Sequence, residues 1–306
     1  MISIIIPIFN EEEGVKNLLK KLKEFNTVQS KLNLEFIFVN DGSSDNSLVE
    51  LKKESVGLNS KIISFSKNFG SHAALRAGIS NASNNLVTFM YADLQDPLQL
   101  IVDLYEEQKK GYDIVWANRK ADKTRLLEGL FSRVYAKIMR KYALSDFPKK
   151  GFDIVFFNEK IKVILNRNQI SNSSIFLQIL SFGFKQTSIE YIKKERKIGK
   201  SKWTISKKIK LFIDSFVSFS YAPLKFVTLM GGFLFSVGFL YSIYLIVRKI
   251  IFNDLDNGWP ALISIILIGF GITNISLGII AEYLWRTFDA ARKSEVFIID
   301  EIIENK

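Results

Sequence analysis

Two hydrophobic patterns alternate along residues 1–120. Short runs rich in isoleucine, valine and phenylalanine predict buried strands, and longer stretches with apolar residues at helical spacing predict amphipathic helices. The predicted strands are 3–9, 35–41, 61–66, 85–92 and 113–119. The predicted helices are 12–25, 45–55, 71–83 and 97–110, followed by 124–142 and 159–182 with a strand-like run at 152–158 between them. This order predicts an α/β fold with a mostly parallel sheet that carries helices on both faces.

The helix predicted for 97–110 has boundary signals at both ends. Asp96 is a favoured N-cap residue, and Pro97 suits the first helical position because proline has no backbone N–H to donate. Gly111 suits the position just after the last turn. We therefore expect Asp96 to cap this helix.

The last third of the chain contains two long uncharged runs, 226–247 and 257–281. Each exceeds the roughly 20 residues that a helix needs to span a bilayer. Buried core helices are the alternative. Before them, residues 204–220 place apolar side chains at helical spacing with lysines between, which is typical of a helix on a membrane surface. The loop between the two runs carries Arg248 and Lys249 against Asp254 and Asp256, and basic residues are more numerous before residue 226 and after residue 285. The positive-inside rule therefore predicts that both termini are cytoplasmic.

The chain is therefore expected to divide into five segments. They are a cytoplasmic α/β domain at 1–203, an interfacial helix at 204–222, membrane helices at 223–249 and 257–285, and a cytoplasmic C-terminal tail at 286–306. This arrangement predicts a multi-pass protein of the inner or plasma membrane.

Composition narrows the possible chemistry. The 306 residues include no cysteine and one histidine, and the formal net charge is +11. Thiolate chemistry is therefore excluded, and the single histidine argues against His-based hydrolysis and a His-ligated zinc site. A strongly basic chain favours anionic partners, which include nucleic acid, anionic lipid and phosphorylated substrates.

Polar clusters follow three of the predicted strands, at 40–45, 67–70 and 93–97. The carboxyl ends of parallel strands share one edge of a sheet, where such folds bind ligands. In the third cluster, Asp93 and Gln95 offer oxygen ligands of the kind that Mg²⁺ or Mn²⁺ prefers, with water and substrate phosphates completing the shell. The alternative is that Asp93 only ends a strand.

The other two clusters offer contacts to a nucleotide. Asp41 can accept hydrogen bonds from a base or a ribose, although an ordinary turn is an equally good interpretation. Lys67 and Arg76 flank a predicted helix start and are candidates for phosphate contacts.

Later residues add an acceptor hypothesis. Arg119 and Arg133 belong to a basic series that follows the fifth strand. Asp153 is a candidate base or orienting carboxylate, with an edge-strand polar residue as the alternative. The basic run at 193–202 precedes the membrane-surface helix, so Arg196, Lys200 and Ser201 could hold an anionic lipid headgroup. Simple membrane anchoring is the alternative.

Taken in order, four motifs resemble glycosyltransferase family 2: IIIPIFNEEEG, VNDGSSDNS, SKNFGSHAALRAGI and YADLQDPLQL. The later ERKIGKSKW and SFSYAPLK, followed by two apolar runs, are similar to the polyprenyl-phosphate glycosyltransferases, including the GtrB-type enzymes and relatives of dolichyl-phosphate mannose synthase. The resemblance implies a GT-A, Rossmann-like fold, a nucleotide-sugar donor (a UDP-sugar), Mg²⁺ or Mn²⁺, and a polyprenyl phosphate acceptor. It also implies a homotetramer and no nucleic-acid partner.

The resemblance assigns roles to individual positions. It implies that the nucleotide pocket includes Pro7, Phe9, Glu11 and Asp41, that the metal pair is Asp93 and Gln95, and that Arg119 and Arg133 contact phosphates. It further implies that Asp153 is the base and that Arg196, Lys200 and Ser201 belong to the acceptor loop. Tyr91 departs from relatives that carry a carboxylate there, which makes the metal geometry less certain.

These residues predict an inverting transfer of a sugar from the nucleotide-sugar to polyprenyl phosphate at the cytoplasmic membrane face. One alternative is a membrane glycosyltransferase that extends a glycan or glycolipid directly. A second alternative is an inactive membrane scaffold, with Tyr91 as the sign of lost activity.

Overall fold

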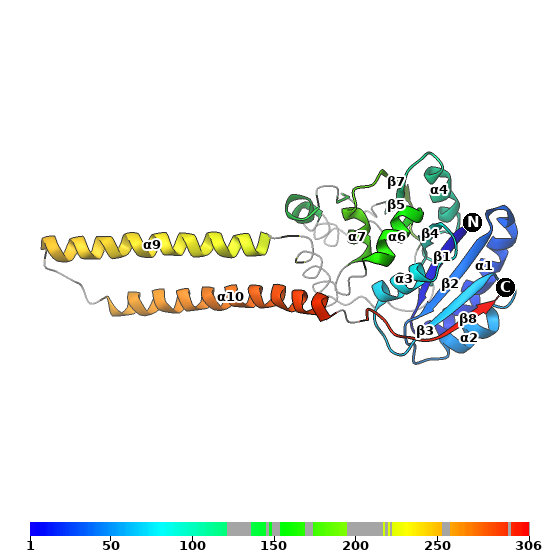
Figure 1. Ribbon diagram of the computed structural model, residues 1–306, viewed down its shortest axis with the longest axis horizontal. Helices are drawn as coiled ribbons and strands as arrows, with labels where there is room; N and C mark the ends of the chain where they lie inside the picture. The colour runs from blue at the N-terminus through cyan, green and yellow to red at the C-terminus, as the bar shows by residue number, and fades with distance from the viewer. Residues whose placement is uncertain are drawn as a thin grey trace. The chain divides into compact units, whose positions relative to one another are not determined.

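The computed structural model describes residues 1–120, 136–144, 147–148, 154–168, 174–194, 217, 220, 222–252, 258–292 and 295–305. The chain forms two compact units, which we call the sheet unit and the helical unit (Figure 1). The sheet unit comprises Met1–Ser215 and Glu295–Lys306, and the helical unit comprises Phe216–Ser294.

The sheet unit is built on one eight-stranded sheet with the order β7-β5-β6-β4-β1-β2-β3-β8. The strands are β1 (Ile2–Ile8), β2 (Leu34–Asn40), β3 (Ser60–Phe65), β4 (Leu86–Phe89), β5 (Ile114–Arg119), β6 (Ile154–Phe157), β7 (Gln186–Tyr191) and β8 (Ile299–Asn305). Strands β6 and β8 are antiparallel to their neighbours, and the other pairings are parallel. The expected mostly parallel sheet is therefore confirmed.

Helices cover both faces of this sheet (Figure 1). Helices α1 (Glu12–Val28), α2 (Ser47–Glu54) and α4 (Gln99–Gln108) share a hydrophobic core with alternate residues of β1 and β2, among them Ile4 and Phe36. Helices α3 (Ser71–Ser80), α6 (Glu159–Arg167) and α7 (Ile175–Ser181) lie on the other face, where Gly78 meets Ile5 and Phe176 meets Phe89. Both faces of β1 are buried, which explains why every residue of the strand except Ser3 is apolar.

Two strands were not expected from the sequence. Strand β7 reads Gln-Thr-Ser-Ile-Glu-Tyr and β8 reads Ile-Asp-Glu-Ile-Ile-Glu-Asn, so each mixes polar with apolar residues and lies at one end of the strand order. Within the C-terminal tail predicted at 286–306, a helix ends at Arg292, and β8 follows and pairs with β3. A strand at the side of a sheet needs only one apolar face, and this weakens its signal in the sequence.

Two helix predictions need correction. The helix expected at 159–182 is two helices, because α6 ends at Arg167 and Asn168 has a non-helical backbone before α7 begins at Ile175. The prediction that Asp96 caps the next helix is wrong. Helix α4 begins at Gln99 with no side-chain cap, and the Asp96 carboxylate bonds elsewhere, as described below. Of the helix expected at 124–142, residues 136–142 are helical and the rest lies outside the described residues.

The helical unit contains α9 (Ala222–Phe252) and α10 (Trp259–Arg292), which run antiparallel (Figure 1). Within them, Ala222–Tyr241 and Ile268–Phe288 are long and apolar enough to cross a membrane. The Tyr283 hydroxyl donates a hydrogen bond to the Ser220 carbonyl oxygen (2.7 Å). Most of the interfacial helix expected at 204–222 lies outside the described residues.

Candidate functional site

The predicted site residues gather where the parallel strands end, which we call the carboxyl edge. Strand β1 lies between β2 and β4, so the crossovers that follow it run in opposite directions along the sheet. Ligands bind at such a switch point in α/β sheets. The register places Ile8 opposite Asn40 and Ile5 opposite Phe89. The loops after β1 and β2 therefore start side by side, and the loop after β4 starts beside β1, three residues before β1 ends.

Side-chain hydrogen bonds join the loops after β1 and β2. The Asn10 N–H donates to Ser43 Oγ (3.0 Å), and the Ser44 N–H donates back to Asn10 Oδ1 (2.8 Å). The Glu11 N–H donates to Ser47 Oγ (2.8 Å). Asn10 adopts a left-handed conformation (φ 50°), which asparagine tolerates better than most residues. These bonds fix the backbone that carries the predicted nucleotide residues Phe9 and Glu11, and Pro7 lies inside β1 opposite Val39.

The Asp41 side chain holds the loop that precedes α3. It is 3% exposed and accepts hydrogen bonds from the backbone N–H groups of Phe69 (2.7 Å) and Gly70 (3.0 Å). Burial raises the pKa of the Asp41 carboxyl to about 6, although the two N–H donors act to lower it. A carboxylate has about four lone-pair sites, so these donors leave room for a further hydrogen bond. The contact between Asp41 and a base or ribose stays a prediction.

Gly42 brings the loops after β2 and β3 into direct contact. Its φ of +63° lies in the left-handed region. A Cβ at this position would lie 2.3 Å from the Lys67 carbonyl carbon and 2.6 Å from the Asn68 nitrogen. The Lys67 ammonium, which is exposed, lies 5.2 Å from the centre of the Phe69 ring. The interpretation of the Asp41 segment as an ordinary turn did not include this close backbone approach.

The predicted metal ligands lie in the loop after β4. Asp93 and Gln95 are half-buried, and the Gln95 N–H donates to Asp93 Oδ1 (3.2 Å) across Leu94, whose φ is 54°. Among the described residues, no group of three or more His, Cys, Asp or Glu side chains could hold a metal ion. Asp93 and Gln95 still fit Mg²⁺ or Mn²⁺, because such ions often take one or two protein ligands and complete the shell with water and phosphate oxygens.

Asp96 ties this loop to the segment that follows β7. Its side chain is 2% exposed and accepts a hydrogen bond from the Tyr191 hydroxyl (2.6 Å), and Lys193 Nζ lies 3.5 Å away. The Lys194 N–H donates to the Gln95 backbone oxygen (2.8 Å). The loop that carries the predicted metal ligands is thus bonded to the stretch that leads into the predicted acceptor loop. Nothing in the sequence pairs Asp96 with Tyr191.

Tyr91, the departure from the family pattern, lies beside the same segment. It is half-buried, and the Lys193 ammonium lies 5.8 Å from the centre of its ring. An ammonium over an aromatic face is a favourable arrangement. Lys193 therefore contacts both Tyr91 and Asp96 in the described structure.

Arg76 does not have the phosphate-facing position that the sequence suggested. It is 3% exposed and donates through one terminal nitrogen to Gln178 Oε1 on α7 (2.7 Å). Burial lowers the pKa of Arg76 to about 10. Burial, together with the positive charge of Arg76, lowers the pKa of His72 to about 4, which keeps this histidine neutral. Both side chains therefore belong to the packing between α3 and α7.

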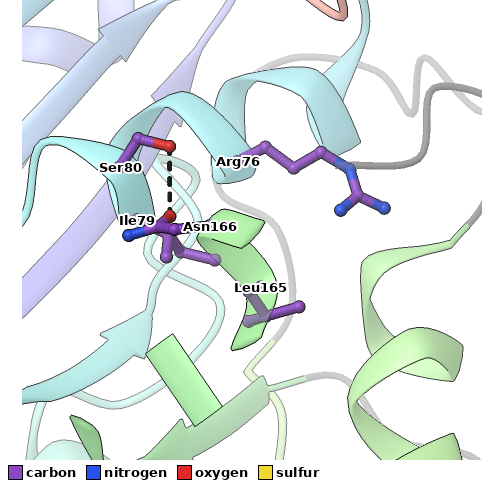
Figure 2. Close-up of a pocket in the computed structure, with 5 residues that line it drawn as sticks. All are labelled: Arg76, Ile79, Ser80, Leu165 and Asn166. Carbon is purple, nitrogen blue, oxygen red and sulfur yellow. Dashed lines mark hydrogen bonds between the residues drawn. The ribbon is translucent and has the colours of Figure 1, made fainter. Parts of the chain in front are cut away.

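A small pocket lies between α3 and α6. It includes Ser80, the last residue of α3, whereas the carboxyl edge lies before the first residue of that helix. Figure 2 shows the Ser80 hydroxyl and Asn166 Oδ1 joined by a hydrogen bond of 3.2 Å, with the Arg76 guanidinium directed away from them. The pocket is lined by Arg76, Ile79, Ser80, Leu165 and Asn166 and contains about 140 Å³ of empty space, including space open to solvent. Ligand pockets usually hold roughly 300–1,000 Å³, so even this upper bound is too small for a nucleotide-sugar.

The remaining predicted residues are only partly described. Arg119 is exposed and ends β5, opposite Tyr191 of β7. Arg133, Asp153, Arg196, Lys200 and Ser201 lie outside the described residues. The structure thus brings the predicted nucleotide and metal residues to one edge, and their roles remain predictions.

Comparison with known proteins gives the family. The family model described as Glycosyl transferase family 2 matches residues 3–165, more than half of the chain. An uncharacterized glycosyltransferase of Bacillus subtilis, YkcC, is 34% identical and covers 99% of this chain and 95% of its own length. A prophage bactoprenol glucosyl transferase homolog of Escherichia coli is 33% identical, and the alignment covers 98% of this chain and 99% of the relative.

Among solved structures, the mannosyltransferase PcManGT of Pyrobaculum calidifontis, in complex with GDP-Man and Mn²⁺, aligns with a TM-score of 0.46. It is 15% identical, and the alignment covers 64% of this chain and 56% of that chain. The resemblance drawn from the motifs is confirmed by the family model and by relatives that match almost the whole sequence. The chain belongs to glycosyl transferase family 2.

Proposed function

We propose that this chain transfers a sugar from a nucleotide-sugar, a UDP-sugar, to polyprenyl phosphate at a membrane surface. The observation that carries the proposal is the carboxyl edge, where the loops after β1, β2 and β3 are bonded together beside Asp93 and Gln95. The two apolar helices support a membrane-bound acceptor. The Escherichia coli relative, whose name refers to bactoprenol and a glucosyl group, supports both the lipid and the reaction.

The donor would lie across the carboxyl edge. Pro7, Phe9 and Glu11 would border the nucleoside on the β1 side, and Asp41 would accept hydrogen bonds from it. Lys67 is exposed on the neighbouring loop, where its ammonium can meet the diphosphate. Because hydrogen bonds already fix these loops, donor binding would need little ordering of the backbone.

Asp93 and Gln95 would hold the divalent ion. Bound Mg²⁺ or Mn²⁺ supplies positive charge that stabilises the departing nucleoside diphosphate. Asp93 is half-buried, and the hydrogen bond that its carboxylate accepts from the Gln95 N–H restricts its rotation. The bond between Lys194 and the Gln95 backbone would then keep this loop next to the acceptor.

The transfer itself is a displacement at the anomeric carbon with inversion. An oxygen of the lipid phosphate forms the new bond, and the bond to the nucleoside diphosphate breaks, with its electron pair leaving on the diphosphate oxygen. By analogy with phosphorylated side chains, the acceptor has a second pKa of about 6 and is largely ionised at neutral pH. Asp153 would therefore act more by orienting the acceptor than by removing a proton.

The acceptor phosphate would be held by basic residues near the membrane. Arg119, Arg133, Arg196, Lys200 and Ser201 are the proposed contacts, and the cytoplasmic face of the inner membrane is the proposed location, with both termini on that side. A homotetramer is the proposed assembly. Tyr91 favours one alternative function, an inactive scaffold that binds lipid without turnover.

Turnover in a defined system tests the proposal. We would supply the detergent-purified chain with undecaprenyl phosphate and a panel of nucleotide-sugars, and measure nucleoside diphosphate release with Mn²⁺ and with EDTA. Lipid-dependent, EDTA-sensitive release from one donor is the expected result. Release that needs a glycan acceptor would favour direct extension, and nucleotide binding without any turnover would favour the scaffold.

A further inference from the structure

The C-terminal segment returns to the sheet unit after α10. Strand β8 pairs antiparallel with β3, and the register runs from Asn305 opposite Ser60 to Ile299 opposite Phe65. Since β3 ends at Phe65, the beginning of β8 lies at the carboxyl edge and its end lies at the opposite edge of the sheet. The Ser66 N–H extends this pairing by donating to the Ile298 carbonyl oxygen (3.2 Å).

Three phenylalanines connect this segment to the loop after β3. The rings of Phe297 and Phe65 are stacked, with centroids 5.4 Å apart and planes 10° apart. The rings of Phe65 and Phe69 meet edge to face, with centroids 5.6 Å apart. Phe65 is 3% exposed, so the ring between the other two is held in the interior. Aromatic pairs in these two geometries contribute beyond the area they bury.

The last ring of this series belongs to the candidate nucleotide site. The Phe69 N–H donates to Asp41, and the Lys67 ammonium lies over the Phe69 ring. A displacement of Phe69 would therefore disturb both the N–H that donates to Asp41 and the ring that the Lys67 ammonium contacts. Next to these ring contacts, the Ser66 N–H at the start of the loop donates to the Ile298 carbonyl oxygen of the C-terminal segment.

We propose that Phe297 is a positioning residue for the donor site: by stacking on Phe65 it fixes Phe69, and through Phe69 it fixes Asp41 and Lys67. This inference rests on the proposed function, because it assigns that loop to the nucleotide. The segment that follows the second apolar helix would then position residues of the nucleotide pocket, and it also pairs with the side of the sheet as a strand.

The rival explanation is that β8 stabilises the sheet in a general way. The structure separates the two explanations, because β8 is also anchored at its other end. Asn305 Nδ2 donates to Ser55 Oγ (2.8 Å). Loss of the Asn305 contact should loosen the strand at the edge opposite the site and leave the phenylalanine contacts in place.

Three substitutions at one position and one matched control form the test, all in the full-length protein. Phe297→Ala removes the ring, and Phe297→Tyr retains it. Phe297→Leu removes the ring but keeps an apolar side chain, and it replaces the alanine variant if that variant does not fold. Asn305→Ala is the control. We would measure hydrogen exchange at residues 66–70, the affinity for UDP, and KM for the donor against kcat.

We expect Phe297→Ala to speed exchange at residues 66–70 and to weaken UDP binding by about threefold to tenfold, the range that loss of one aromatic pair supports. The donor KM should rise more than kcat falls. Phe297→Leu should show a smaller effect in the same direction, and Phe297→Tyr and Asn305→Ala should resemble the unaltered protein.

Equal effects of Asn305→Ala and Phe297→Ala on UDP affinity would overturn the inference, and so would unchanged exchange at residues 66–70. Faster exchange with unchanged UDP affinity would also overturn it, since the loop would then not serve the donor. If the unaltered protein binds no nucleoside diphosphate, the proposed function fails, and the exchange comparison still decides whether Phe297 orders the loop.

Discussion

Replacement of Gly42 by alanine tests whether close contact between two loops builds the site. Gly42 has a φ of +63°, and an added Cβ would lie 2.3 Å from the Lys67 carbonyl carbon and 2.6 Å from the Asn68 nitrogen. Both neighbours are backbone atoms, so no side-chain rotation can relieve the overlap. The loop after β3 must move, and with it the N–H groups that bond to Asp41.

Two costs set the size of the effect. A non-glycine residue in the left-handed region costs about 1 kcal/mol, and overpacking costs about 1–3 kcal/mol, so the free energy of unfolding should fall by about 2–4 kcal/mol. Domains are stable by about 5–15 kcal/mol, so the variant should remain folded. If about 1.4 kcal/mol of this cost appears as lost binding free energy, the UDP affinity falls about tenfold. We therefore expect a fall of at least about tenfold.

Gly57→Ala is the matched control. Gly57 has a φ of +84°, and an added Cβ there would meet nothing within 4 Å, so only the conformational cost of about 1 kcal/mol applies. Urea unfolding, followed through tryptophan fluorescence, and calorimetric titration with UDP would measure both variants. If Gly42→Ala and Gly57→Ala lose the same stability and both bind UDP normally, the loop contact does not build the site.

Two further predictions concern buried carboxylates. Tyr191→Phe removes a hydrogen bond to the buried Asp96, and should lower the free energy of unfolding by about 2 kcal/mol, measured by urea titration; unchanged stability would contradict the proposed link. Because the pKa of Asp41 is raised to about 6, the folded state keeps this proton longer than the unfolded chain does, so stability should fall as pH rises from about 4 to 6. Asp41→Asn should flatten that slope, and an equal slope in both proteins would refute the assignment.

The sequence was sufficient to predict the parts of the fold with strong local patterns. The five apolar strands, the helices between them and the two long apolar helices all follow from periodicity and run length. The order of these elements then placed Asp41, Lys67 and Asp93 at one edge, because parallel strands share their carboxyl ends.

The rest depends on contacts between distant residues, which periodicity does not record. Strand β8 is stabilised by pairing with β3, although more than 230 residues separate them, and its own sequence is mostly polar or charged. Asp96 satisfies every local rule for a helix cap, yet its carboxylate bonds to Tyr191. Arg76 was expected to face phosphates, but its side chain is buried against α7.

The central claim is that this chain attaches a sugar to polyprenyl phosphate with the help of Asp93. The most direct test is to supply undecaprenyl phosphate and a nucleotide-sugar with an isotope-labelled sugar, and to identify the lipid product by mass spectrometry. Asp93→Asn would be compared with Asp103→Asn, an exposed aspartate on α4. We predict a labelled sugar joined to the lipid through a single phosphate, formed by the unaltered protein and by Asp103→Asn, and lost in Asp93→Asn. Label in water-soluble free sugar or in a glycan alone, or full product formation by Asp93→Asn, would contradict the account.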